Sequence, residues 1–198
     1  CPSDGAMGRS WLSFARSNYV SCFGTAMQFP DADNFNRSLL WNSSFDLDGE
    51  FVETDGSFRI QGKRTGRKLA KITDGTSHTI MVSELIAGKV DVSDSTGYDS
   101  RGLWIMTWMG DSMYTHFLTP NSSAGDGMHV STCRPSMKMP CNHLGHEMGY
   151  AAARSLHPGG VVAVSGDGHV GFYSNDIDLL AWQALATYAG SDVGLEAP

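Results

Sequence analysis

Four side chains that can bind a metal ion lie within seven residues of this sequence: Cys141, His143, His146 and Glu147. Thiolate, imidazole and carboxylate groups are ligands that zinc accepts, so this segment is a candidate metal-dependent enzyme site centred on His143, His146 and Glu147. Their order differs from the His-Glu-x-x-His pattern of metalloproteases. A disulfide at Cys141 would also remove that residue as a ligand.

Ser155, His157 and Asp167 are the residue types of a hydrolase triad, but their spacing does not favour one. No Gly-x-Ser-x-Gly turn surrounds the serine. Residues 161–165 are typical of a strand, which rises about 3.3 Å per residue. This places His157 at the open end of a hairpin and Asp167 at its tip, beyond hydrogen-bonding distance. The sequence therefore predicts that the two side chains do not touch.

Two acidic segments offer carboxylate ligands for a cation. Their carboxylates belong to Asp46, Asp48, Glu50, Asp91, Asp94 and Asp99. The first segment is spaced like the start of a calcium loop, but the twelfth position lacks the glutamate of an EF-hand. Calcium is therefore a candidate ligand, and solvated turns or exposed loops are the alternative interpretation.

The four cysteines are enough for two disulfides, which form in an oxidising compartment. Closeness in sequence favours Cys1 with Cys22 and Cys133 with Cys141. The other two pairings remain open, and four free thiols are a further alternative. Asn121 begins an Asn-Ser-Ser glycosylation pattern, which predicts that it is exposed.

The elements that would position these residues are most strongly indicated in residues 155–190. Val161 to Val164 is typical of a buried strand, and Val170 to Tyr173 of its return strand. Gly166-Asp167-Gly168 between them predicts a type I′ turn with positive φ angles. Asp176 or Asp178 can cap a following helix, which Gly190 would end.

Other elements are indicated more briefly. Short strands are expected within residues 17–24, at 51–52 and 58–60, and at 79–83, where Glu84 ends the strand and faces inward. Gly102 to Gly110 is predicted as a core strand, and residues 120–147 as mostly loop. If Trp104 and Trp108 were exposed instead, they would form a platform for a solute or glycan.

Composition limits the classes of function. The 198 residues are 41% hydrophobic, which is enough for a core, and the 23 glycines indicate many turns. The net charge is −7 and no basic stripe is present, so nucleic acid is not an expected partner.

Several stretches together resemble the exported, type IV pilin-like proteins of planctomycete-type bacteria, a group also classified as domain of unknown function 1559. The signature of that group is a histidine, nine residues and Asp-Gly, here His157 followed by Asp167-Gly168. Further matches are Cys1-Pro2-Ser3-Asp4, Asp74-Gly75-Thr76-Ser77, Thr119-Pro120-Asn121-Ser122 and Ile177-Asp178. The resemblance covers nearly the whole chain.

The resemblance implies one α+β head domain over residues 1–198, with an antiparallel β-sheet, long loops and a carboxy-terminal hairpin and helix. It implies a non-enzymatic subunit that is exported to the cell surface, periplasm or extracellular space and requires no cofactor. Its expected partners are further copies of itself and related pilin-like subunits, in a filament or homo-oligomer. Membrane attachment is expected only through an amino-terminal pilin helix that this chain does not contain.

Overall fold

The computed structural model describes residue 4 and residues 15–25, 50–54, 57–61, 68–88, 99–104, 109–129, 132–144 and 149–190. The strands in these ranges are β1 (Tyr19–Cys22), β2 (Glu50–Thr54), β3 (Ser57–Gln61), β4 (Ile80–Glu84), β5 (Met113–Tyr114), β6 (Asp126–His129), β7 (Cys141–Leu144), β8 (Gly160–Ser165) and β9 (Val170–Ser174). The helices are the 3-10 helix η1 (Leu69–Lys71) and the α-helix α2 (Leu179–Ala184). No helix in the described part of the chain has the length and apolar character needed to cross a bilayer.

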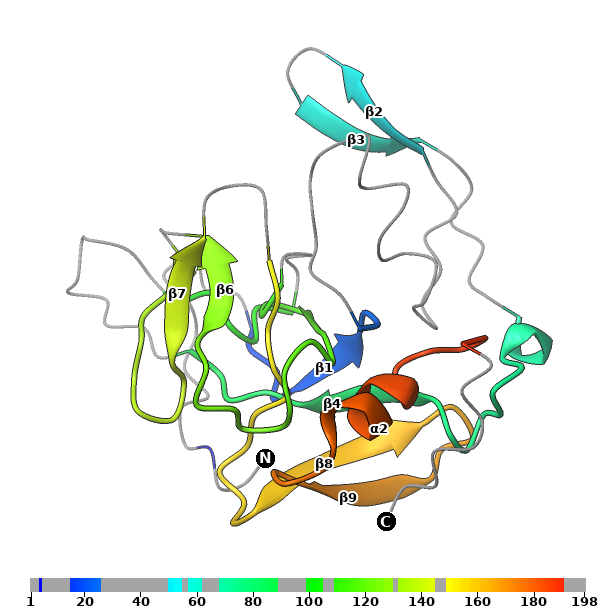
Figure 1. Ribbon diagram of the computed structural model, residues 1–198. Helices are drawn as coiled ribbons and strands as arrows, with labels where there is room; N and C mark the ends of the chain where they lie inside the picture. Colours follow the sequence, from blue (N-terminus) through cyan, green and yellow to red (C-terminus); the bar gives the residue numbers. More distant parts are fainter. Residues whose placement is uncertain are drawn as a thin grey trace.

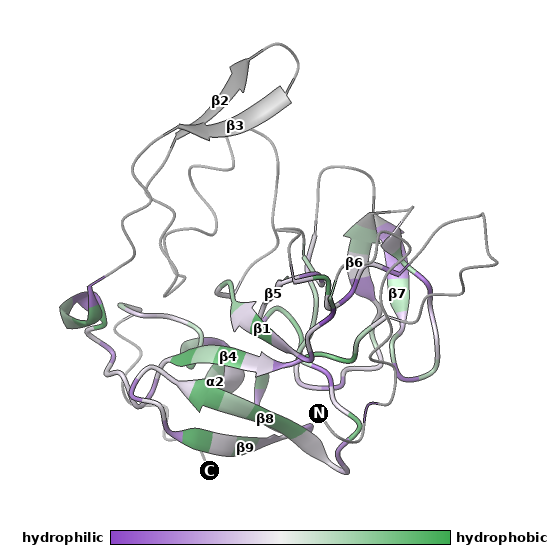
Figure 2. Ribbon diagram, turned by 180° about the vertical axis from the view of Figure 1, so that it is seen from behind, coloured by the Kyte–Doolittle hydropathy of each residue, from purple (hydrophilic) through white to green (hydrophobic). Residues whose placement is uncertain are grey.

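The main sheet has five strands in the order β5-β1-β4-β8-β9. Figure 1 shows β1, β4, β8 and β9, and Figure 2 also labels β5. The predicted α+β class is compatible with this architecture, but the sheet is mixed rather than antiparallel. β1 pairs parallel with β5, because the long connection between them lets the chain return in the same direction. β6 and β7 also form a parallel pair, so the prediction of loop over residues 120–147 is wrong there.

The carboxy-terminal hairpin has the predicted strands but a different turn. β8 and β9 pair antiparallel from Gly160 with Ser174 to Val164 with Val170. Gly168 has a φ of +87°, whereas neither Gly166 nor Asp167 has a positive φ. The Gly168 amide donates to the Ser165 carbonyl, so a turn with ordinary φ angles is followed by one left-handed glycine. The type I′ prediction is therefore wrong.

Helix α2 follows the hairpin and is shorter than expected. The Asp178 carboxylate caps it by accepting hydrogen bonds from the amides of Leu180 and Ala181. The helix ends at Ala184, well before Gly190. Trp182 is fully buried and joins α2 to the core against β1, β4 and β8.

The opposite face of the sheet is also apolar, although α2 does not cover it. Ladder partners point to the same side, so Val82, Val164 and Val170 lie in one row and Val162 lies beside Phe172. The exposed fractions of Val170 and Phe172 are 58% and 57%, and the other three side chains are half-buried. We call these five residues the outer-face patch; hydrophobic colour marks β4, β8 and β9 in Figure 2.

Candidate functional site

The signature histidine contacts a buried carboxylate, not the signature aspartate. The Nε2 atom of His157 lies 3.2 Å from Oε1 of Glu84, and Oε2 of Glu84 accepts a hydrogen bond from the Val162 amide at 2.9 Å. Glu84 faces inward as predicted and is 1% exposed. Asp167 lies in the turn at the far end of β8, where its carboxylate accepts from the His169 amide. The predicted separation of His157 and Asp167 is therefore confirmed.

A polar clamp built around Asn121 and Ser155 closes the open end of the hairpin. The Asn121 amide nitrogen donates to the Gly160 carbonyl at 3.2 Å and to Oδ1 of Asn175 at 2.9 Å, and its own oxygen accepts from the Ser155 amide. Asn121 has a φ of 51°, a left-handed conformation that asparagine tolerates. Its amide is thus engaged in the fold, and the residue is half-buried rather than exposed as its glycosylation pattern predicted.

Ser155 is held as a structural residue. Its hydroxyl donates to the Gly160 carbonyl at 2.7 Å and accepts from the backbone amide of His157 at 3.1 Å. Neither bond involves the imidazole ring, which contacts Glu84 instead. A nucleophile would need a base at hydrogen-bonding distance from its hydroxyl, and this arrangement aims the hydroxyl at a carbonyl.

The candidate metal ligands are not assembled into a site by the described residues. Asp46, Asp48, Asp91, Asp94, His146 and Glu147 lie outside them, as does the side chain of Glu50 on β2. His143 is exposed on β7, and Cys141 is bonded to Cys133 and so cannot be a ligand. Within the described ranges, no three histidine, cysteine or acidic side chains come together to hold a metal.

Asp99 is not a cation ligand in this structure, because its carboxylate binds a buried arginine. Its Oδ2 lies 2.6 Å from a terminal nitrogen of Arg101, and both residues are buried. The prediction that Asp99 belongs to an exposed acidic loop is therefore wrong. An ion pair satisfies the carboxylate, as a buried charge requires.

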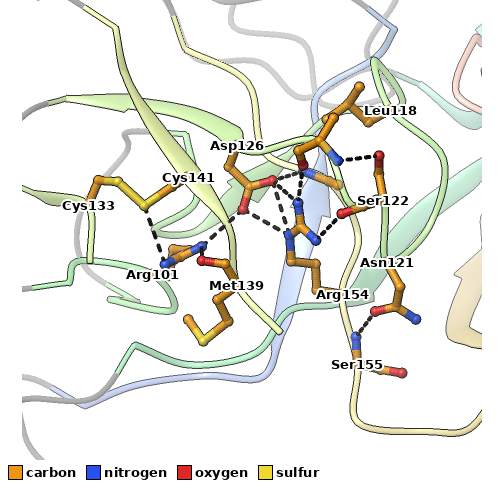
Figure 3. A network of polar contacts seen from close by, with 12 residues as sticks. Arg101, Leu118, Asn121, Ser122, Asp126, Cys133, Met139, Cys141, Arg154 and Ser155 are labelled. Carbon is orange, nitrogen blue, oxygen red and sulfur yellow. Dashed lines mark hydrogen bonds and ion pairs between the residues drawn. A yellow bond between two sulfur atoms is a disulfide. The ribbon is translucent and has the colours of Figure 1, made fainter. Parts of the chain in front are cut away.

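Asp99 and Arg101 are one end of a buried network that continues through Asp126 to Arg154. Asp126 accepts from Arg101 at 3.1 Å and from Arg154 at 2.8 Å, and it also accepts from the Ala152 amide (Figure 3). Arg154 further donates to the carbonyls of Ser122 and Ala124. The carboxylate of Asp126 thus pairs with the positive charges of two buried guanidinium groups.

The disulfide between Cys133 and Cys141 closes a loop around the Arg101 guanidinium. Arg101 donates to the carbonyls of Arg134 and Met139, both inside that loop. Burial lowers the pKa of Arg101, but hydrogen bonds and charges from Asp99 and Asp126 outweigh it and raise the pKa overall. This disulfide confirms one predicted pairing. Cys22 is buried, and Cys1 lies outside the described residues, so the predicted pairing of Cys1 with Cys22 stays a prediction.

Asp111 is a buried carboxyl that sequence reasoning did not single out. It is fully buried, and neither of its side-chain oxygens has a hydrogen-bond partner among the described residues. Burial raises the pKa of Asp111 to about 8. The Ser100 hydroxyl lies near enough to lower that pKa, but not in hydrogen-bonding geometry. Asp111 is therefore largely protonated at neutral pH.

His116 is a second buried titratable group that sequence reasoning missed, and it belongs to the core. Its ring stacks on Trp182 with the ring centroids 3.6 Å apart. Its Nδ1 atom contacts the Trp182 carbonyl, which can only accept, so Nδ1 carries the proton and Nε2 accepts from the Tyr114 hydroxyl. Burial lowers the pKa of His116 to about 3, so the ring stays neutral.

The predicted core strand over Gly102 to Gly110 is wrong at its start. Gly102 is a turn residue with a φ of 81°, and Trp104 is 68% exposed. Trp108 lies outside the described residues. The structure therefore presents one of the two tryptophans of the proposed glycan platform to solvent.

Comparison with known proteins places the chain by its sequence. Residues 1–180 match the family described as "Protein of unknown function (DUF1559)". No curated protein and no solved structure matches the chain. The matched range contains His157, Asp167 and the arginine network, and it covers most of the chain. The chain therefore belongs to the DUF1559 family.

Proposed function

We propose that this chain is the head domain of a pilin-like structural subunit, which acts through contacts between subunits in an extracellular or cell-envelope filament. The observation that carries the proposal is the outer-face patch. An antiparallel sheet with one solvated face normally alternates apolar and polar residues, so that its open face is polar. Here the open face has five adjacent apolar side chains, two of them more than half exposed. An exposed apolar surface of this kind is typical of a protein–protein contact.

The chemistry of the signature residues supports a non-enzymatic role. Ser155, His157 and Glu84 hold the hairpin to β4 through hydrogen bonds to backbone groups and to each other. Asp126 is occupied by two arginines. The role of these residues is thus best explained as structural, because their hydrogen bonds hold the carboxy-terminal hairpin rigidly against β4. The Cys133–Cys141 disulfide is in keeping with export to an oxidising compartment.

A solute- or glycan-binding module is the second candidate function. Its support is Trp104, which is 68% exposed and whose indole could stack on a sugar ring. Replacing Trp104 with alanine would then abolish retention on immobilised polysaccharides. Loss of retention without any effect on assembly would favour this candidate.

Electron microscopy of cells that make the natural gene product tests the filament proposal. Antibodies against the 198-residue chain should decorate filaments that leave the cell surface, and deletion of the gene should remove those filaments. Diffuse labelling of single molecules, with the same filaments present after deletion, would contradict the proposal.

A further inference from the structure

We propose that the outer-face patch of one copy binds the tip of the disulfide loop of the next copy. The tip is residues 134–139, which the Cys133–Cys141 bond encloses. This inference rests on the proposed function, because it names the two surfaces through which the subunits would join.

The tip is a rigid turn with an apolar side chain at its end. The amides and carbonyls of Ser136 and Met139 bond reciprocally, at 3.2 and 3.1 Å, which leaves Met137 and Lys138 at the end of a tight turn. Met137 is 95% exposed, more than any other exposed large hydrophobic side chain of the described residues. Arg101 and the disulfide hold the base of the loop, so docking costs little backbone conformational entropy.

The patch offers an apolar surface of matching character. Val170 and Phe172 stand on the edge strand β9, and half-buried Val162 and Val164 fill the space beside them. In the described sheet β9 pairs on one side only, with β8. The unbranched Met137 side chain can adapt to such a surface, and methionine is enriched in protein–protein interfaces.

Charge also favours this pairing. The tip contains Arg134 and Lys138 and no acidic residue, whereas the hairpin that carries most of the patch, residues 160–174, contains one aspartate and no lysine or arginine. This aspartate, Asp167, is exposed and lies in the turn that follows Val164 and precedes Val170. On a chain with a net charge of −7, most random contacts between copies repel. A basic tip docked beside Asp167 is an exception and favours this pairing.

The pairing joins two different surfaces, so it can continue indefinitely. The loop of the tip is anchored on the small core cluster of Met128, Cys133 and Cys141, whereas β8 packs on the separate cluster around Trp182. Each copy would therefore keep a tip free after its patch is filled, or a patch free after its tip is docked. Such a heterologous contact extends into an open chain unless its rotation closes a ring.

The test is the self-association of the 198-residue chain measured by sedimentation velocity over a range of concentrations. Two variants remove the surfaces: M137D/K138E for the tip and F172D for the patch. Each should weaken self-association about tenfold or more, because each places a charge in an apolar contact. Leu180 is 66% exposed and lies outside both surfaces, so L180D is the matched control and should associate like the natural chain.

Mixing the two variants distinguishes this pairing from a symmetric one. The tip variant keeps its patch and the patch variant keeps its tip, so the mixture should form one-to-one dimers that do not grow. Added salt should weaken these dimers, because their opposite charges are exposed. A tip variant that associates as strongly as the natural chain would overturn the inference and indicate that patches bind each other.

The same variants separate the inference from the proposed function in cells. Filaments that form normally with M137D/K138E and F172D would refute this contact while leaving the filament proposal standing. Absence of filaments from the unmodified gene product would refute the proposed function itself. Filaments lost in both variants and kept in L180D are the expected result.

Discussion

Glu84 joins His157 to Val162: one carboxylate oxygen lies 3.2 Å from the His157 imidazole and the other accepts the Val162 amide at 2.9 Å. Because Glu84 ends β4 and Val162 lies in β8, the carboxylate bridges two neighbouring strands as well as the signature segment. The histidine of the signature thus has a structural partner that precedes it by 73 positions in the chain.

Replacement of Glu84 by leucine should lower the free energy of unfolding by about 1–3 kcal/mol, because it leaves the partly buried Val162 amide without this acceptor. Glutamine can still accept from that amide and donate to the imidazole, so E84Q should lose less stability than E84L. Urea denaturation measures the free energy of unfolding of both variants. If E84L were no less stable than D176N, a change at an exposed carboxylate, the bridge would have no energetic importance.

Replacement of Asp126 by alanine should lower the free energy of unfolding by about 3–5 kcal/mol, because it leaves the guanidinium groups of Arg101 and Arg154 buried without this partner. Unfolding of D126A in guanidinium chloride measures this loss. The exposed Lys138 provides the comparison, and K138A should change stability by no more than about 0.5 kcal/mol. Equal stability of the two variants would contradict the assigned role of Asp126.

Stability should decrease as pH rises from about 4 to about 8, because of Asp111. In the folded protein burial raises the pKa of Asp111 to about 8, whereas its ordinary value is 3.8. Between these values the folded chain keeps a proton that the unfolded chain releases, so rising pH favours unfolding. The D111N variant lacks this group, and its melting temperature should fall less between about pH 5 and about pH 8. Parallel pH profiles of the two proteins would refute the buried, protonated state.

Replacement of Gly168 by valine should lower the free energy of unfolding by about 1 kcal/mol or more, because a β-branched residue does not tolerate the left-handed conformation. The glycine φ is +87° and a Cβ atom there would meet nothing within 4 Å, so the cost is conformational and not a clash. Asparagine adopts this conformation more easily, and G168N should lose less stability in thermal unfolding. Similar losses for both variants would point to another cause.

Local patterns in the sequence were sufficient for the hairpin. A short β-branched run and an Asp-Gly pair predict β8, the turn and β9, and the spacing alone separates His157 from Asp167. The type of turn was not predictable, because Asp-Gly is compatible both with two positive φ angles and with one left-handed glycine after an ordinary turn.

Contacts between distant residues could not be read from local patterns. Asp99 contacts Arg101 only two positions away, but only the fold brings the disulfide loop to both residues, through backbone groups of Arg134 that are 35 and 33 positions away. Arg154 and Asp126 are likewise 28 positions apart. The parallel pairing of β1 with β5 depends on a long crossover, for which a short two-residue strand gives no signal. The outer-face patch emerges only when the register of three strands is known.

The strand order β5-β1-β4-β8-β9 also determines when the sheet can be completed during synthesis. Tyr19 pairs with Glu84, Ser21 with Met113 and Val82 with Val164, so in the described sheet only β8 and β9 are joined by a short turn. A chain that emerges from its amino terminus must keep β1 and β4 incompletely paired until much later segments are made. Pairing over such distances slows folding. The signature hairpin is therefore the last part of the sheet to be synthesised, and a chain that stops before it would leave one edge of β4 open to aggregation.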